Sequence, residues 1–118
     1  MIGRERGAGT VLIMAVMLIA AMTAFISACL LAWVGCAHKA RSVADLAALA
    51  ASQAYANGQD ACPVAKLTAS SNGATMTACA VESNGVNFVV TVTVMVQASP
   101  QLGVGPDHFT QTSAAGNL

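Results

Sequence analysis

The feature that most constrains this chain is an uncharged run from Gly7 to Ala37, in which no Asp, Glu, Lys or Arg occurs. A helix needs about 20 apolar residues to cross a bilayer, and this run is longer. Arg4 precedes the run and Lys39 follows it, while Trp33 lies near its end. An indole ring favours the interface between membrane and water. The run therefore predicts a membrane-anchoring helix.

The composition excludes one class of partner. Only 8% of the 118 residues are charged, the formal net charge is zero, and 56% of the residues are hydrophobic. Proteins that bind nucleic acid cluster Lys and Arg to neutralise phosphates, and this chain has no such cluster. We therefore expect no nucleic-acid partner. The part outside the long helix is small, and a domain of that size usually needs a covalent staple.

The long helix is predicted to continue past the membrane surface. Residues 38–57 are rich in alanine, the best helix former, and contain neither Pro nor Gly. Asn57-Gly58 then predicts the end of the helix, because glycine adopts a left-handed conformation at low cost. Five segments follow from these boundaries: a polar N-terminal segment (1–7), a transmembrane helix (8–37), its continuation (38–57), a small extracytoplasmic α+β domain (58–99) and a flexible tail (100–118).

The predicted small domain begins with a short helix. Asp60 is expected to cap a helix over residues 61–70, with Val64 and Leu67 as candidate buried positions. Residues beyond Pro100 show little periodicity, which is why we expect a flexible tail there or, as the alternative, a segment lying at the edge of the domain.

Two strands are predicted after the short helix, over residues 75–82 and 87–97, joined by a turn at 83–85. In the second strand one face carries Phe88, Val90, Val92, Val94 and Val96, and Thr91 and Thr93 mark the other. A bare hairpin is only marginally stable, so the short helix or the end of the long helix should cover the valine face. The expected fold class is α+β: one long N-terminal transmembrane helix continuing into a polar helix, then a short helix packed on a small antiparallel β-hairpin.

The four cysteines fall into two pairs. For Cys62 and Cys79 we predict a disulfide, which implies an oxidising, extracytoplasmic compartment; two free thiols are the alternative. Cys29 and Cys36 lie in the apolar run and are read as packing residues, because buried free cysteine behaves as a small hydrophobe. Neither pair has CxxC spacing and the histidines are isolated, so no metal site is expected.

A row of small residues recurs at four-residue spacing along the predicted helix. Such spacing lets helix backbones approach closely in lipid, and the row therefore predicts packing against other helices. Plain alanine richness is the competing explanation. The row comprises Ala20, Ala24, Ala28, Ala32, Cys36, Ala40, Ala44 and Ala48, and it continues through Ser52 and Ala56.

Groups that could converge for catalysis are few. Asp45 is expected to be an exposed charge one turn from Arg41, with which it can pair. His108 has no nearby nucleophile. We therefore expect no enzyme, no cofactor and no small-molecule substrate.

The N-terminal segment has two interpretations. Arginines before an apolar run are typical of a signal or anchor, and the length of the run favours an uncleaved anchor. Ile26-Ser27-Ala28-Cys29 looks like a bacterial lipobox, which would place a lipid on Cys29. The chain stays apolar after that cysteine, which disfavours this alternative.

Two segments resemble the TadE/TadG-like proteins, small pilin-like subunits of the tight-adherence (Flp) pilus and secretion machinery. They are Arg4-Glu5-Arg6-Gly7-Ala8-Gly9-Thr10-Val11-Leu12 and Ala40-Arg41-Ser42-Val43-Ala44-Asp45-Leu46-Ala47-Ala48-Leu49-Ala50-Ala51. The branch most similar is the actinobacterial helicase/secretion-neighbourhood TadE-like group. The similarity includes Asp60-Ala61-Cys62 and the valine/threonine strand, and within it Asp45 is the family-motif residue.

The resemblance implies a single-pass protein of the cell membrane, with its C-terminal part extracytoplasmic or surface-assembled. It also implies other Tad/Flp-type pilus or secretion subunits as partners, contacted through the long helix. In classical members a peptidase cuts after a glycine and a glutamate is the fifth mature residue. Here Gly7 and Ala8 would flank the cut, but the fifth position is Leu12. A minor, membrane-resident structural subunit is therefore expected rather than a major fibre subunit.

The alternative function is a membrane-anchored binding module, lipidated or not, that engages an envelope or host partner. In that case the hairpin would bind through its exposed strand edge. Thr91 and Thr93 on the outer face would then carry partner capture.

Overall fold

The computed structural model describes the backbone of residues 2–117 and the side chains of residues 7–117, with two helices and three strands. Helix α1 spans Ile2–Ala56, and helix α2 spans Ala61–Ser71. The strands are β1, Thr75–Ser83, β2, Phe88–Gln97, and β3, His108–Gly116. The chain forms two compact units, one up to Ala32 and one from Trp33, and each is described separately below. The α+β fold class expected from the sequence is confirmed.

Helix α1 starts earlier than predicted. The sequence placed a polar segment at 1–7 and the helix start at residue 8, whereas α1 already includes Ile2; Met1 lies outside the described residues. The C-terminal end was predicted well. Gly58, with φ of +82°, donates its backbone N–H to the Tyr55 carbonyl oxygen at 3.0 Å, and Gln59 donates to that of Ala54 at 2.8 Å. A left-handed glycine thus ends the helix and satisfies its last carbonyls.

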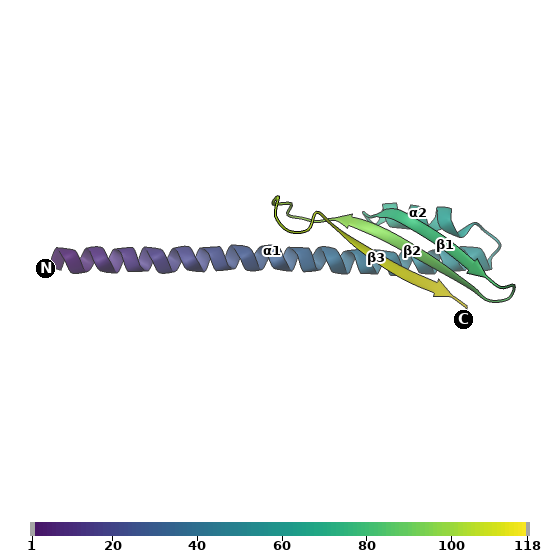
Figure 1. Cartoon of the computed structure of the whole chain (residues 1–118), viewed down its shortest axis with the longest axis horizontal. Helices are drawn as coiled ribbons and strands as arrows, with labels where there is room; N and C mark the ends of the chain where they lie inside the picture. Colours follow the sequence, from purple (N-terminus) through teal and green to yellow (C-terminus); the bar gives the residue numbers. More distant parts are fainter. Residues whose placement is uncertain (1, 118) are drawn as a thin grey trace. The chain divides into compact units, whose positions relative to one another are not determined.

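The three strands form one antiparallel sheet in the order β1-β2-β3. Figure 1 shows them side by side with β2 in the middle. A bulge between Met76 and Ala78 interrupts the β1–β2 register, while β2 and β3 pair without interruption from Val89–Gly116 to Gln97–His108. Every second residue of β2 is buried, as the alternation of its sequence predicts.

The expectation of a flexible tail was wrong for residues 108–116, which form strand β3; the alternative, a segment lying at the edge, agrees with the position of β3 at one edge of the sheet. Phe109 and Ala115 pack at the border of the core, and they are the two apolar residues on the inner face of β3. Strand β3 is held chiefly by its backbone ladder with β2, a long-range interaction that leaves little hydrophobic pattern in the sequence. Asn117 closes its end: Phe88 N–H donates to Asn117 Oδ1 at 2.8 Å.

The core lies between the valine face of β2 and the alanine faces of both helices. The fully buried Val90, Val92 and Val94 form its centre. Alanines leave room for the backbones to approach the sheet closely, and the valines fill the space. The helix residues of this core are Ala40, Val43, Ala44, Ala47, Ala48 and Ala51 from α1, with Ala61, Ala65 and Ala69 from α2.

Helix α2 turns a different face to the sheet than predicted. Val64 is half-buried and Leu67 is 68% exposed, while Ala65 and Ala69 are completely buried. Asp60 lies at the N-cap position of α2, but its side chain makes no capping hydrogen bond, so the capping role predicted for it was wrong. The bond from Cys62 to strand β1 helps to set which side of α2 faces inward.

Candidate membrane anchor and assembly surface

The described part of the first unit exposes apolar side chains along most of its length, while Cys29 is buried. Helix α1 is the one helix among the described residues that is long and apolar enough to cross a membrane, judged by length and composition. Its large side chains between residues 11 and 31 are more than half exposed, with Leu31 at 72%. A helix that is hydrophobic all round is normally covered by lipid or by other helices. This stretch fits a single-pass membrane anchor.

The row of small residues divides into two parts with different surroundings. Ala40, Ala44 and Ala48 are fully buried against the chain's own sheet, and Ser52 is 9% exposed. The members nearer the N-terminus are exposed: Ala20, Ala24, Ala28 and Ala32. Packing of the whole row against other helices is therefore ruled out for residues 40–52, whose partner is the valine face of β2. Only the exposed part remains available to neighbouring helices.

Cys36 lies at the junction of these two parts. It is half-buried, and its Sγ lies 3.9 Å from the Ser99 carbonyl oxygen. Both Cys36 and Cys29 are free thiols. Gly7 and Ala8, the residues that would flank a peptidase cut, are exposed and lie inside α1.

Asp45 contacts the last strand. Its Oδ1 accepts a hydrogen bond from Ser113 Oγ at 2.5 Å, which joins α1 to β3 across a large sequence separation. The sequence predicted Arg41 as its partner, one turn away on the helix. Ser113 was missed because it belongs to the segment predicted as a flexible tail. Asp45 therefore has a structural contact that explains a carboxylate among alanines.

The predicted disulfide between Cys62 and Cys79 is confirmed, with a Cα–Cα distance of 5.8 Å. It ties α2 to β1 across a sequence separation of 17. In the chain-entropy model, closing a loop of this size contributes about 3 kcal/mol to stability. Disulfides form in oxidising compartments, so the bond agrees with an extracytoplasmic location for the second unit.

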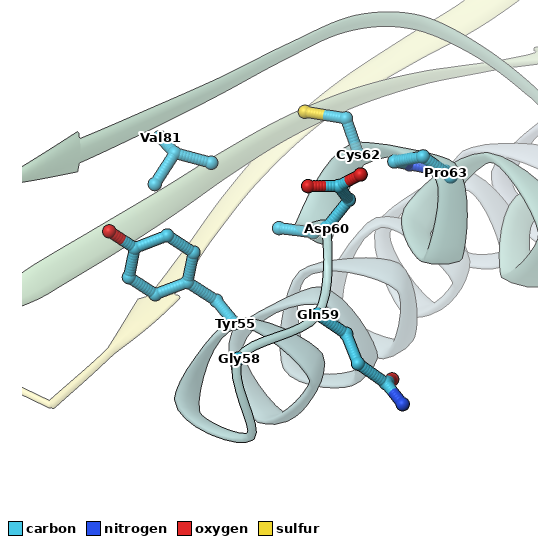
Figure 2. Close-up of a pocket in the computed structure, with 8 residues that line it drawn as sticks. Tyr55, Gly58, Gln59, Asp60, Cys62, Pro63 and Val81 are labelled. Carbon is cyan, nitrogen blue, oxygen red and sulfur yellow. The ribbon is translucent and has the colours of Figure 1, made fainter.

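A shallow hollow of about 610 Å³ lies between the end of α1, the start of α2 and strand β1. Figure 2 shows the Tyr55 ring, Val81 and the Asp60 carboxylate around it. Tyr55 is held by a ring contact with Phe88, with centroids 4.7 Å apart. Asp60 is exposed, and the hollow gathers no second titratable carboxylate, histidine or free thiol among its lining residues. The hollow therefore shows no set of groups that could carry out acid–base or nucleophilic chemistry.

The outer face of the sheet is uncharged over its middle. Thr91 and Thr93 are half-buried on this face, and Thr93 Oγ1 shares a hydrogen bond with Thr112 Oγ1 at 2.9 Å.

Within residues 7–117 no group of three or more His, Cys, Asp or Glu side chains is placed to hold a metal ion.

Comparison with protein families, with curated proteins and with solved structures finds no match for this chain.

Proposed function

We propose that this chain is a pilin-like structural subunit, anchored in the cell membrane, that assembles through its long helix into a Tad/Flp-type pilus or secretion apparatus. The observation that carries the proposal is the division of α1. Its C-terminal part packs on the sheet, while its N-terminal part keeps an apolar surface with a row of small residues that no part of its own unit covers.

This surface suits association in lipid. Between helices in a membrane there is little hydrophobic driving force, so close backbone packing at small residues provides the attraction. Ala20, Ala24, Ala28 and Ala32 supply such a strip. The strip drifts by about 40° per step, because four residues exceed the 3.6-residue turn, and this favours oblique crossings.

The disulfide and the apolar helix support the orientation proposed here, with the second unit on the extracytoplasmic side. The TadE-like segments around Gly7 and Asp45 support the choice of apparatus. Leu12 in place of the glutamate of classical members supports a membrane-resident role over a fibre-forming one.

The test is to widen the strip. The test variant carries Ala24→Leu, Ala28→Leu and Ala32→Leu, whose larger side chains keep neighbouring helices apart. The measurement is the yield of crosslinked complexes in membranes, between differently tagged copies of the chain or with partner subunits. We expect this yield to fall at least tenfold. The control carries Ala15→Leu, Met22→Leu and Ile26→Leu, whose mean direction lies about 140° around the helix from that of residues 24, 28 and 32 at 100° per residue.

The control should assemble like the native chain. Equal complex formation by all three proteins would contradict assembly through the strip. If assembly then proved sensitive to Thr91→Ala and Thr93→Ala instead, the chain would act as a membrane-anchored binding module.

A further inference from the structure

The loop between β2 and β3, residues 98–107, is held against Trp33 of α1. The Trp33 indole N–H donates to the Pro100 carbonyl oxygen at 2.9 Å. Gly105, with φ of +90°, lies on the ring, where a Cβ atom would come within 2.7 Å of Trp33 Cη2. Only glycine fits this approach. The loop is therefore fastened at the level of Trp33 on the helix.

The loop carries exposed apolar side chains and no charge at its tip. Its base is closed where the Ala98 N–H donates to the Asp107 carbonyl oxygen at 2.9 Å. Between these two residues no charged residue occurs. Leu102 is 45% exposed and Val104 is 74% exposed. A turn that joins two strands in water usually carries polar residues, as the β1–β2 turn does at Ser83-Asn84-Gly85.

The helix is also uncharged at this level. Trp33 directly follows the exposed apolar stretch of α1, and the next charged residue along α1 is Lys39. The uncharged parts of helix and loop thus meet at a tryptophan, the residue type enriched where a membrane meets water.

We propose that the β2–β3 loop is a second membrane contact, in which Leu102 and Val104 enter the interfacial layer of the bilayer that α1 crosses. The inference rests on the proposed membrane anchoring of α1. Two contacts, one through the helix and one through the loop, fix how the domain is rotated on the membrane surface. The hydrogen bond to Pro100 and the Gly105 contact hold the loop in place for this role.

The opposite end of the domain provides a matched control. Phe88, at the start of β2, contacts Tyr55 near the end of α1, so the β1–β2 turn lies beside that end of the helix. At a rise of 1.5 Å per residue, roughly 33 Å of helix separates Tyr55 from Trp33. Val86 in this turn is 85% exposed. It is as apolar and exposed as Val104 but far from the proposed membrane surface.

The experiment uses the full chain with Cys29→Ser and Cys36→Ser, reconstituted in phosphatidylcholine/phosphatidylglycerol vesicles. Val104→Cys, Leu102→Cys and, as the control, Val86→Cys are each labelled with an environment-sensitive fluorophore. At 104 and 102 we expect blue-shifted emission, quenching by lipids with a shallow spin label, and at least threefold weaker quenching by aqueous iodide than at 86.

Equal iodide access at all three positions, in a chain that resists alkaline extraction, would overturn the loop contact and leave the anchor standing. Release of the chain by alkaline extraction would overturn the anchor and, with it, the loop contact. A fluorophore shielded from iodide at all three positions would show burial by protein assembly and would equally contradict a contact specific to the loop.

Discussion

Asp45 connects helix and strand through one side chain. Its carboxylate accepts a hydrogen bond from the Ser113 hydroxyl at 2.5 Å. By contrast, the carboxylate of Asp60, at the N-cap position of α2, makes no capping hydrogen bond. A hydrogen bond to a charged group near the surface contributes modestly, about 1 kcal/mol or less. The contact still matters locally, because β3 buries few apolar side chains of its own.

We therefore expect Asp45→Ala to loosen β3 more than the rest of the domain. Amide hydrogen exchange of residues 109–115 should rise about threefold to fivefold, since this is the change that about 1 kcal/mol produces. Exchange in β2 should change less. Asp60→Ala is the control, and it should leave the amide hydrogen exchange of β2 and β3 unchanged. If Asp45→Ala and Asp60→Ala behave alike, the Ser113 contact does not hold β3.

Helix α1 is a single element with two surfaces. Ala44 is fully buried in the domain core, whereas Ala24, about five and a half turns earlier in the same row, is exposed. Spacing alone treats these alanines as equivalent. Their surroundings distinguish them, because Ala44 belongs to the core that contains the valines of β2, whereas Ala24 is exposed.

Ala44→Leu should accordingly lower the free energy of unfolding of the domain by about 1–3 kcal/mol, the range typical of overpacked cores. Ala24→Leu should leave the unfolding midpoint of the domain unchanged. Denaturant unfolding in detergent micelles, followed by circular dichroism of the sheet, measures both. A midpoint shift for Ala24→Leu as large as that for Ala44→Leu would show that the two positions share one environment.

The hydrophobic pattern of the sequence predicts strand β2 but not strand β3. Strand β2 was predicted because an apolar residue occupies every second position from Phe88 to Val96, and the residues at these positions are buried. Strand β3 was missed because its inner positions include Gln111 and Ser113, which carry no hydrophobic signal. Strand β3 pairs with β2, which is already ordered by its buried valines, and a segment needs only an extended backbone to form this pairing.

At the level of the whole molecule, exposed apolar residues occur in both units but need different explanations. Leu18 and Met22 belong to the exposed apolar stretch of the first unit, while Leu46 and Leu49 are exposed on the second. Single exposed apolar residues are ordinary on a protein surface, but a continuous apolar helix is not.

This difference predicts how charge will be tolerated. Leu18→Arg with Met22→Arg should sharply reduce the fraction of chain that resists alkaline extraction, because each arginine at the centre of a membrane helix costs about 2.5–3.5 kcal/mol. Leu46→Arg with Leu49→Arg, the matched pair outside the apolar run, should leave that fraction unchanged. If both pairs are retained in the membrane alike, residues 8–37 are not the membrane-spanning part.

Local composition and short-range pattern were enough to predict the long apolar helix, its end at Gly58 and the alternation of β2. Each of these depends on residues that signal their state without reference to distant parts of the chain. The disulfide between Cys62 and Cys79 was predicted with two free thiols as the alternative, because it also requires that α2 and β1 meet.

Contacts between distant segments are set by the fold of the whole domain. The fold decides that both helices pack on the valines of β2, makes residues 108–116 a third strand, and places the β2–β3 loop on Trp33. Small and polar residues such as Ala44 and Ser113 are compatible with many environments, so the segment that meets them fixes what they do.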